Sequence, residues 1–373
     1  MQTCAIVVTS IFDNGWLERV TKELEQSGEK DNVTIIFIAD FKTPALIFEK
    51  IKTLCFAGFK IIAPTIEEQF VYEKKIALNN FILVNSDHRR NLGYLISYEN
   101  GFDFVISMDD DNFPLTKNFI NEHRLRLGPQ KDKLEITSKN QAYNNCTLLD
   151  ENTFLHPRGF PFDRRTDNFN LTYKNIDNVK VAVNAGMWTI SPDVDAISWL
   201  ILNKKFEHKR DVSDFILNKE TYCPINSQNT SLLREYIPAY YFIRMGYDIG
   251  GGLKFDRLGD IYSGYFLQKI AKESLASVGF GMPLVTHERN SHNYLNDANG
   301  EWGSLRTIDE FFDWIINIEI QGSSIEELYS SLIAELHEFA SITKFRFMQT
   351  STAGFYHEMA YDMSKWLKVI KTI

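Results

Sequence analysis

The chain has 373 residues and a formal net charge of −9, from 40 Lys and Arg against 49 Asp and Glu. Proteins that bind nucleic acid or anionic membranes present a basic surface, so this acidic balance disfavours both kinds of partner. No apolar stretch reaches the roughly 18 residues of a transmembrane segment, and the first residues lack the basic region of a signal peptide. The four cysteines are widely spaced, which disfavours a disulfide framework or a zinc site and indicates a reducing, cytoplasmic setting.

The first 110 residues alternate between predicted strands and predicted helices. Apolar and β-branched runs predict strands at residues 5–11, 33–39, 59–63, 81–84 and 102–108. Helical spacing predicts helices between them, at residues 17–26, 44–56, 66–78 and 89–100. This alternation indicates right-handed βαβ units, so we predict an α/β fold with a Rossmann-like, mostly parallel sheet. Ligands of such sheets bind at the carboxyl ends of the strands.

The rest of the chain is predicted to end in long helices. Residues 114–222 are less periodic, with the turn-rich segment HPRGFPFDRR and a predicted strand at 180–190. Helices are predicted around 237–244 and at 261–270, and three amphipathic helical segments follow residue 307. We therefore expect a main α/β domain over residues 1–305 and a C-terminal helical region over 306–373. This region packs on the main domain or forms a homo-oligomer.

Three consecutive aspartates, Asp109, Asp110 and Asp111, directly follow the predicted strand FVISM. Adjacent carboxylates repel one another unless a positive charge lies among them. Side chains alternate along a strand, so we expect Asp109 and Asp111 on one side, where they can ligate Mn²⁺ or Mg²⁺ together with diphosphate oxygens. The DxD motif of nucleotide-sugar glycosyltransferases follows the same logic. The alternative is a solvated acidic turn, which the position at a strand end disfavours.

Polar residues at the other strand ends complete a predicted nucleotide site. Thr9 and Ser10 end the first strand and Asp40 ends the second, where nucleotide folds contact base and ribose. Arg89 and Arg90 lie at the start of a predicted helix, where paired N–H donors can bind a diphosphate. Each of these residues has an ordinary alternative, as a helix cap or as a surface side chain.

Three further residues carry possible chemistry. Arg158 lies between aromatic residues in HPRGFPF, where it can pair with phosphate or belong to a structural turn. Asp260 precedes a predicted helix, where it can act as a base, orient a sugar hydroxyl or cap the helix. His287 follows the apolar run GMPLVT, where it can complete a metal site, although an isolated histidine is more often structural.

The ordered motifs of this chain resemble those of the reversibly glycosylated polypeptides, whose plant members are UDP-arabinopyranose mutases. The motifs are FDFVISMDDDNF, HPRGFPF, VAVNAGMWTISPDVDA, FDRLGDIYSGY and MPLVTHERNSHNYL. The resemblance runs along nearly the whole chain. It implies a glycosyltransferase A-type fold and an enzyme that acts on a nucleotide sugar with a divalent metal, usually Mn²⁺.

The resemblance also assigns residues. It places the family's aspartate triplet on residues 109–111, its self-glycosylated arginine on Arg158, an asparagine of the nucleotide-sugar site on Asn229, and a histidine on His287. The late acidic pair of the family is reduced here to a single carboxylate, Asp260, because the preceding residue is a glycine. The family also has a cysteine after the triplet, where this chain has an asparagine. Both departures weigh against the arabinose mutase specificity of the family.

We predict a metal-dependent glycosyltransferase that uses a nucleotide-sugar donor, with UDP as the nucleotide, and a carbohydrate or other glycosyl acceptor. In this prediction the metal ligands are Asp109, Asp111 and His287, and the catalytic residues are Asp260 and Arg158. The nucleotide-sugar contacts are Thr9, Ser10, Asp40, Arg89, Arg90, Asp110 and Asn229.

Two alternatives remain open at this point. The first is a mutase that interconverts pyranose and furanose forms of a UDP-sugar, in which the diphosphate leaves and returns to the same anomeric carbon. An adduct on Arg158 would require deprotonation, since a charged guanidinium is a poor nucleophile. The second alternative is a non-catalytic, glycosyltransferase-like assembly subunit.

Overall fold

The computed structural model describes residues 2–149, 155–165, 170–201, 206, 214–289 and 293–373. Its N-terminal part is a parallel βαβ unit in which β1 pairs with both β2 and β4, and β2 pairs with β3. The bounds of these strands are β1 (Cys4–Ser10), β2 (Val33–Ala39), β3 (Lys60–Ile62) and β4 (Phe104–Asp109). The order β3-β2-β1-β4 brings the carboxyl ends of β1, β2 and β4 to one edge of the sheet.

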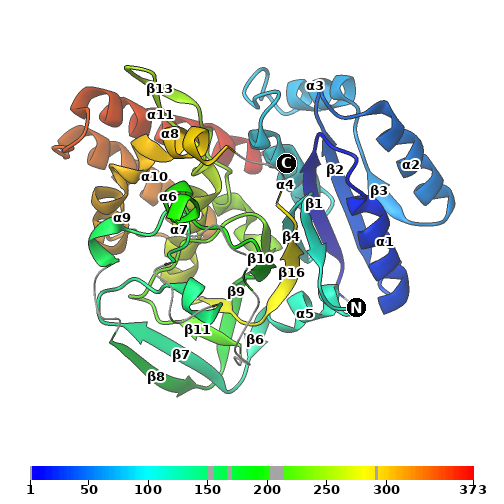
Figure 1. The fold of residues 1–373 in the computed structure, drawn as a ribbon, viewed down its shortest axis with the longest axis horizontal. Helices are drawn as coiled ribbons and strands as arrows, with labels where there is room; N and C mark the ends of the chain where they lie inside the picture. The colour runs from blue at the N-terminus through cyan, green and yellow to red at the C-terminus, as the bar shows by residue number, and fades with distance from the viewer. Residues whose placement is uncertain (1, 150–154, 166–169, 202–205, 207–213, 290–292) are drawn as a thin grey trace.

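The parallel strands form because their side chains are buried on both faces. The β2 run VTIIFIA is buried along its whole length, with helices α1 (Trp16–Ser27) and α2 (Ala45–Phe56) beside the strands in Figure 1. Helix α4 (Arg90–Glu99) packs against β1 and β2. A Cβ on Gly93 of this helix would lie 2.4 Å from a methyl of Val7, so glycine is needed for this close approach.

Antiparallel pairings begin at β12 (Asn229–Leu233), which lies between β4 and β9 (Val179–Ala185). Beyond β9 the sheet continues through β15, β11, β7 and β8, and β6 also pairs with β9. The bounds are β6 (Gly128–Gln130), β7 (Lys133–Ser138), β8 (Leu171–Ile176), β11 (Phe215–Leu217) and β15 (Ser277–Phe280).

A separate three-stranded sheet connects the residues after the aspartate triplet with a late part of the chain. It contains β5 (Asn112–Pro114), β16 (Pro283–His287) and β10 (Met187–Ile190). In the β16–β5 register, His287 lies opposite Asn112. This pairing places an imidazole beside the carboxylates although the two residues are far apart in the sequence.

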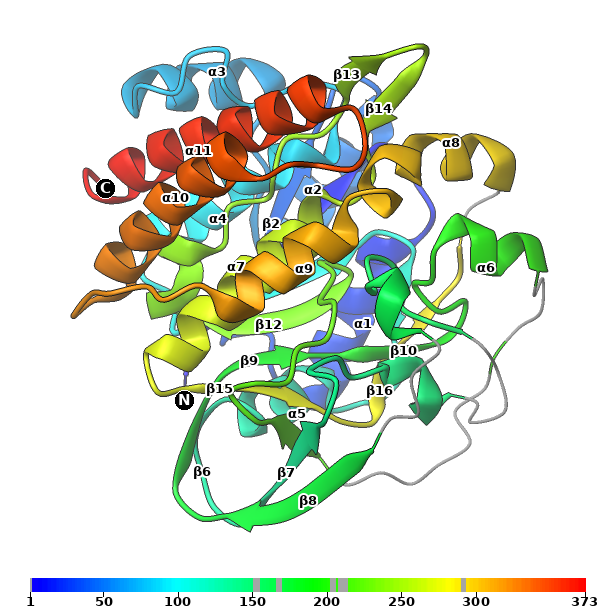
Figure 2. The same ribbon diagram turned by 90° about the vertical axis from the view of Figure 1, so that its left-hand side faces the viewer.

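The C-terminal helices pack into the same core as the sheet. Helices α10 (Ile325–Ile342) and α11 (Gln349–Ile370) run side by side in Figure 2. In Figure 1, α10 lies on the side of the molecule opposite the N-terminal βαβ units, and α11 runs from that side toward them, so that the chain ends near α4. The buried indole of Trp366 donates from Nε1 to the carbonyl of Pro238 at 2.9 Å. The other elements are α3 (Ile66–Lys75), α5 (Phe119–Leu125), α6 (Ala196–Ile201), α7 (Gly259–Glu273), α8 (Tyr294–Leu305), α9 (Ile308–Asn317), β13 (Tyr247–Gly250) and β14 (Leu253–Phe255).

The predicted α/β fold class is confirmed, with its Rossmann-like parallel unit and its C-terminal helices. Two element predictions were wrong. Residues 81–84 form a turn instead of a strand, although the side chains of Phe81 and Ile82 are buried in the hydrophobic core. The helix expected at 237–244 is a short 3₁₀ turn, because Pro238 interrupts helical hydrogen bonding and the side chain of Asn91 binds both the N–H and the C=O of Phe242.

The expected strand at 180–190 is divided into β9 and β10 at Gly186, whose N–H donates to the carbonyl of Asn229 at 2.8 Å. A Cβ at this glycine would lie 2.4 Å from that carbonyl oxygen, so no other residue fits without a shift of the chain. Residues 290–292, within the quoted motif MPLVTHERNSHNYL, lie outside the described residues. No helix in the described ranges is long and apolar enough to cross a lipid bilayer.

Candidate active site

Two adjoining cavities lie where β1, β2 and β4 end. The smaller one, here called the strand-end cavity, has a volume of about 200 Å³ and includes the loops after β1 and β2. The larger one, here called the charged cavity, has a volume of about 390 Å³. Asp87 lines both cavities, and the aspartate triplet separates them, because Asp110 lines the first while Asp109 and Asp111 line the second.

The strand-end cavity contains most of the predicted nucleotide contacts. It is lined by Thr9, Ser10, Asp40, Arg89 and Asp110, together with Ile11, Phe12, Ile38, Lys42, Asn85, Ser86 and Asp87. The hydroxyl of Ser10 donates to Asp110 at 2.5 Å, and Asp40 accepts hydrogen bonds from the backbone N–H groups of Phe41 and Ser86 at 2.8 and 3.2 Å. Burial raises the pKa of Asp110 to about 6. The predicted strand-end residues therefore do converge on one space.

The two adjacent arginines have different surroundings. Arg89 is buried and donates to Gln69 from Nε at 2.9 Å, with Glu73 at 3.5 Å from Nη2. Its Nη1 is buried without a hydrogen-bond partner among the described residues. Arg90 lines the charged cavity and pairs with Asp109, and its Nη1 donates to the carbonyl of Ser227 at 3.0 Å. Arg90 thus fixes Asp109 within the site.

Asp111 and His287 form the most compact pair near the predicted metal position. Nε2 of His287 lies 3.3 Å from Oδ2 of Asp111, and its Nδ1 lies 2.6 Å from the carbonyl of Ser191. Burial opposes charge on both groups, but their mutual attraction lowers the pKa of Asp111 and raises that of His287. A hydrogen bond from Nδ1 to a carbonyl is the arrangement that orients Nε2 of a metal-ligating histidine.

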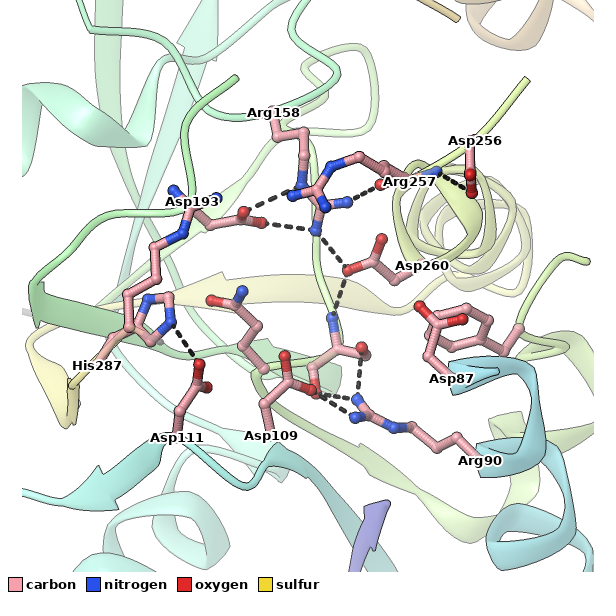
Figure 3. A pocket seen from close by; sticks show the side chains of 14 residues that line it. Asp87, Arg90, Asp109, Asp111, Arg158, Asp193, Asp256, Arg257, Asp260 and His287 are labelled. Carbon is pink, nitrogen blue, oxygen red and sulfur yellow. Dashed lines mark hydrogen bonds and ion pairs between the residues drawn. The ribbon is translucent and has the colours of Figure 1, made fainter. Parts of the chain in front are cut away.

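The donor chemistry of this corner fits a hard divalent cation, with two carboxylates and an imidazole. Asp109, Asp111 and His287 all line the charged cavity, as Figure 3 shows. The fit is incomplete in one respect, because Asp109 is turned toward Arg90. Accordingly, the described residues contain no group of three or more His, Cys, Asp or Glu already close enough together to hold a metal ion.

Arg158 lies at the centre of an ionic cluster on the opposite wall of the charged cavity. Its Nε and Nη2 donate to the two oxygens of Asp193 at 3.0 and 3.1 Å, and Nη2 also donates to Asp260 at 2.9 Å (Figure 3). Its Nη1 donates to the carbonyl of Arg257. Burial opposes the guanidinium charge, but Asp193 and Asp260 reverse this and raise the pKa of Arg158 well above its usual value. The arginine is therefore protonated and held on all sides.

The charged cavity has more acidic than basic groups. Its ionic lining consists of Asp87, Asp109, Asp111, Asp193, Asp256, Asp260, Arg90, Arg158, Arg257, Arg289 and His287. Each of its four arginines is ion-paired with at least one protein carboxylate. Among the described residues, by contrast, no cation forms an ion pair with Asp87 or Asp256. The cavity therefore favours a ligand that brings a cation or hydroxyl groups.

The structure does not bring Asn229 to either cavity. Its side chain is fully buried, donates to the carbonyl of Met187 at 2.9 Å, and accepts from Nε2 of His123 at 3.0 Å. These bonds connect β12 to the start of β10 and to α5. The geometry indicates a role in positioning strands rather than direct contact with a ligand.

Several lining residues were not among the predicted ones. Asp87 lies two residues before the predicted Arg89, and Asp193 and Asp256 lie inside the quoted motifs VAVNAGMWTISPDVDA and FDRLGDIYSGY. Neither spacing nor periodicity distinguishes them from neighbouring polar residues that point elsewhere. Gln228, beside the predicted Asn229, and Arg289, two residues after the predicted His287, also line the charged cavity. At Asn229 the expected polar position is therefore occupied by its neighbour in the chain, Gln228.

Comparison with known proteins identifies relatives. UDP-arabinopyranose mutase 1 of Oryza sativa subsp. japonica is 24% identical over 260 residues, which cover 67% of this chain and 64% of that protein. UDP-arabinopyranose mutase 2 of Arabidopsis thaliana is 23% identical over 290 residues, covering 75% of this chain and 70% of that protein. The chain thus matches about two thirds of the length of these relatives.

Among solved structures, one that the comparison finds similar is glucosyl-3-phosphoglycerate synthase from Mycobacterium tuberculosis in complex with Mn²⁺, uridine diphosphate and phosphoglyceric acid. The two share 11% sequence identity and a TM-score of 0.39, over 86% of this chain and 81% of that one. A sequence model of the family described as "Reversibly glycosylated polypeptide" matches residues 69–373. Since this match covers most of the chain and confirms the resemblance seen in its motifs, the protein belongs to the reversibly glycosylated polypeptide family.

Proposed function

We propose that the protein is a metal-dependent enzyme of UDP-sugars, with glycosyl transfer as its reaction. The observation that carries this proposal is the position of the aspartate triplet between two adjoining cavities. A nucleotide sugar that spans both would place its nucleoside in the strand-end cavity, its diphosphate beside the triplet, and its sugar in the charged cavity. Ligands of α/β sheets bind at this edge.

In this proposal Asp111, His287 and Asp109 hold a divalent cation, Mn²⁺ or Mg²⁺. When bound, the cation would neutralise the charge that develops on the departing diphosphate. To bind the cation, Asp109 would have to turn partly away from Arg90. It would stay within the charged cavity, which both residues line. Ser10 and Asp40 would contact the nucleoside half of the ligand.

The protein's own residues would bind and orient the donor. Arg158 fixes Asp193 and Asp260 in place, because it donates hydrogen bonds to both. The backbone N–H of Ser227 also donates to Asp260, at 3.3 Å. This wall is therefore rigid before a ligand arrives, which is the preorganisation that efficient transition-state binding requires.

A mutase is the second candidate, because the two relatives described above are named UDP-arabinopyranose mutases. Incubation of the protein with a UDP-sugar and Mn²⁺, followed by chromatography, separates the two activities. A new isomer of the UDP-sugar indicates a mutase, whereas release of UDP that depends on an added acceptor indicates a transferase.

Titration calorimetry with UDP, with and without Mn²⁺, tests the proposal as a whole. We expect UDP to bind and Mn²⁺ to strengthen binding at least ten-fold. If UDP does not bind under either condition, both enzyme functions are rejected. The protein would then be better described as a non-catalytic subunit that keeps the fold.

A further inference from the structure

The charged cavity contains a carboxylate that the predicted site did not include, Asp256. Its neighbour Asp260 is the residue that the motifs indicate, but the oxygens of Asp260 are already engaged. Oδ2 accepts from Arg158 at 2.9 Å and from the N–H of Ser227 at 3.3 Å, while Oδ1 accepts from the N–H of Ile261 at 3.0 Å. A carboxylate bonded on both oxygens by its own protein is poorly placed to bind a sugar hydroxyl.

The position before Asp260 cannot carry a second carboxylate. A Cβ added to Gly259 would lie 2.3 Å from the carbonyl oxygen of Ile243 and 2.9 Å from the ring of Phe242. These contacts are closer than any real side chain tolerates, and the backbone of Ile243 is itself held by a hydrogen bond to the carbonyl of Gly259. A second acidic group beside Asp260 must therefore come from a position other than Gly259.

Asp256 lies three residues before Gly259 and faces the charged cavity. Its Oδ1 accepts from the N–H of the next residue, Arg257, at 2.9 Å, and its Oδ2 has no hydrogen-bond partner among the described residues. Asp256 connects β14 to the short turn that leads into α7. One carboxylate oxygen therefore remains free for a ligand.

The turn that presents Asp256 is strained and firmly anchored. Arg257 has a φ of +66°, a left-handed conformation that costs energy for a residue with a side chain. Its side chain is fixed to α8 through Asp297 at 3.1 Å and Glu301 at 3.2 Å. Its carbonyl accepts the hydrogen bond from Arg158. A strained backbone conformation persists only where the surrounding structure imposes it. Such positions cluster at functional sites.

A second, independent feature of the same cavity indicates a polar ligand. Gln228 lines the cavity and is only 8% exposed, yet its Oε1 has no hydrogen-bond partner within the described part of the chain. A buried amide without a partner is costly, so such groups are normally satisfied by water or a ligand. Gln228 lies next to Asp109, whose N–H donates to the carbonyl of Gln228 at 3.3 Å.

From these contacts we propose that Asp256, and not Asp260, is the carboxylate that accepts hydrogen bonds from the hydroxyl groups of the bound sugar. Gln228 contributes a neutral amide to the same ligand. Asp260 is a positioning residue that holds Arg158 and the backbone of Ser227. This assignment rests on the proposed binding of a nucleotide sugar, and it identifies the residues that recognise the sugar half.

The test compares affinities for UDP and for UDP-glucose, both with Mn²⁺, in the full-length protein. For Asp256→Ala we expect the affinity for UDP to stay within two-fold of wild type, while the affinity for UDP-glucose falls about ten-fold, as for loss of one charge-assisted hydrogen bond. Asp256→Asn, which keeps an acceptor oxygen, should lie between the two. The exposed Asp31→Asn is the matched control and should change neither affinity.

Asp260→Asn provides the contrast, because it should lower the melting temperature by loosening Arg158, whereas Asp256→Ala should not. The assignment is overturned if Asp256→Ala changes the affinities for UDP and UDP-glucose by the same factor, or changes neither. If wild-type protein does not bind UDP, the proposed function itself fails, and the assignment fails with it. The two failures are therefore distinguished by UDP binding to the wild type.

Discussion

Arg158 donates hydrogen bonds from Nε and Nη2 to both carboxylate oxygens of Asp193, at 3.0 and 3.1 Å. Such a two-point pair is among the strongest polar contacts in proteins. Nη2 also donates to Asp260, and Nη1 to the carbonyl of Arg257, so every guanidinium nitrogen is engaged. The family resemblance assigns self-glycosylation to this position, whereas the structure presents it as the centre of a buried ionic cluster.

The first prediction is that Arg158 carries no sugar after incubation with a UDP-sugar and Mn²⁺. A protonated guanidinium has no lone pair for attack, and its two acidic partners raise its pKa further. Peptide mass spectrometry of the treated protein should show the unmodified mass for the peptide that contains Arg158. A mass increase of one sugar residue on that arginine would show that the cluster opens during turnover.

The second prediction concerns the metal position. Asp111→Asn should reduce the enhancement of UDP binding by Mn²⁺ at least ten-fold, because an amide is a weaker ligand for a hard cation than a carboxylate. UDP binding without metal should not weaken, because the substitution removes a negative charge beside the proposed diphosphate position. Calorimetry with and without Mn²⁺ measures both quantities. An enhancement equal to that of wild type would mean that the triplet is only an acidic turn.

The third prediction separates a structural role from a binding role for Asn229. Asn229→Ala removes the acceptor of His123 and the donor to Met187, both in the core. It should lower the free energy of unfolding by about 1–3 kcal/mol, the cost of leaving buried polar groups without partners. UDP affinity should stay within two-fold of wild type. Urea unfolding measures the first effect, and a large loss of UDP affinity in a stable variant would restore Asn229 to the binding site.

The position of the candidate site could be predicted from the sequence, because strand ends and carboxylates are local features. The run FVISM followed by three aspartates predicts both a buried strand and a polar group at the sheet edge, and the structure places Asp111 within 3.3 Å of His287. The hydrogen-bond partners of Arg89 and Arg90 could not be predicted from the sequence in this way. Whether Arg89 faces a ligand or Gln69 depends on how α3 packs, which is a long-range contact. The same holds for Asp256, whose exposure to the cavity depends on the left-handed turn at Arg257.

The fourth prediction is that the C-terminal helices are required for folding. The ring of Phe355 stacks on Phe255 with centroids 4.2 Å apart, directly before the turn at Asp256, and the indole of Trp366 is fully buried. Trp366→Ala should therefore lower the free energy of unfolding by about 3–5 kcal/mol. Tyr361→Ala, on the same helix but 55% exposed, should cost less than about 1 kcal/mol. Equal effects of the two substitutions in urea unfolding would argue that α11 is loosely attached.

The last prediction is a stabilising substitution whose effect depends on pH. Glu23 on α1 is 7% exposed, its Oε1 accepts from the N–H of Phe119 at 3.1 Å, and its Oε2 is buried without a hydrogen-bond partner in the described ranges. Burial raises its pKa to about 7. The folded protein therefore binds a proton at Glu23 more tightly than the unfolded chain, where glutamate has a pKa near 4.3. The stability that this residue contributes is complete below about pH 4.3 and is lost as the pH rises through about 7.

Glu23→Gln keeps the acceptor for Phe119 and removes the charge. Relative to wild type, it should be stabilised by about 1–3 kcal/mol at pH 8, and this gain should disappear near pH 4.5. Glu25→Gln, on the exposed face of the same helix, is the matched control and should show no such pH-dependent difference. Urea unfolding at both pH values measures these differences. A gain that is the same at pH 8 and pH 4.5 would mean that it comes from packing or helix propensity and not from the ionisation of Glu23.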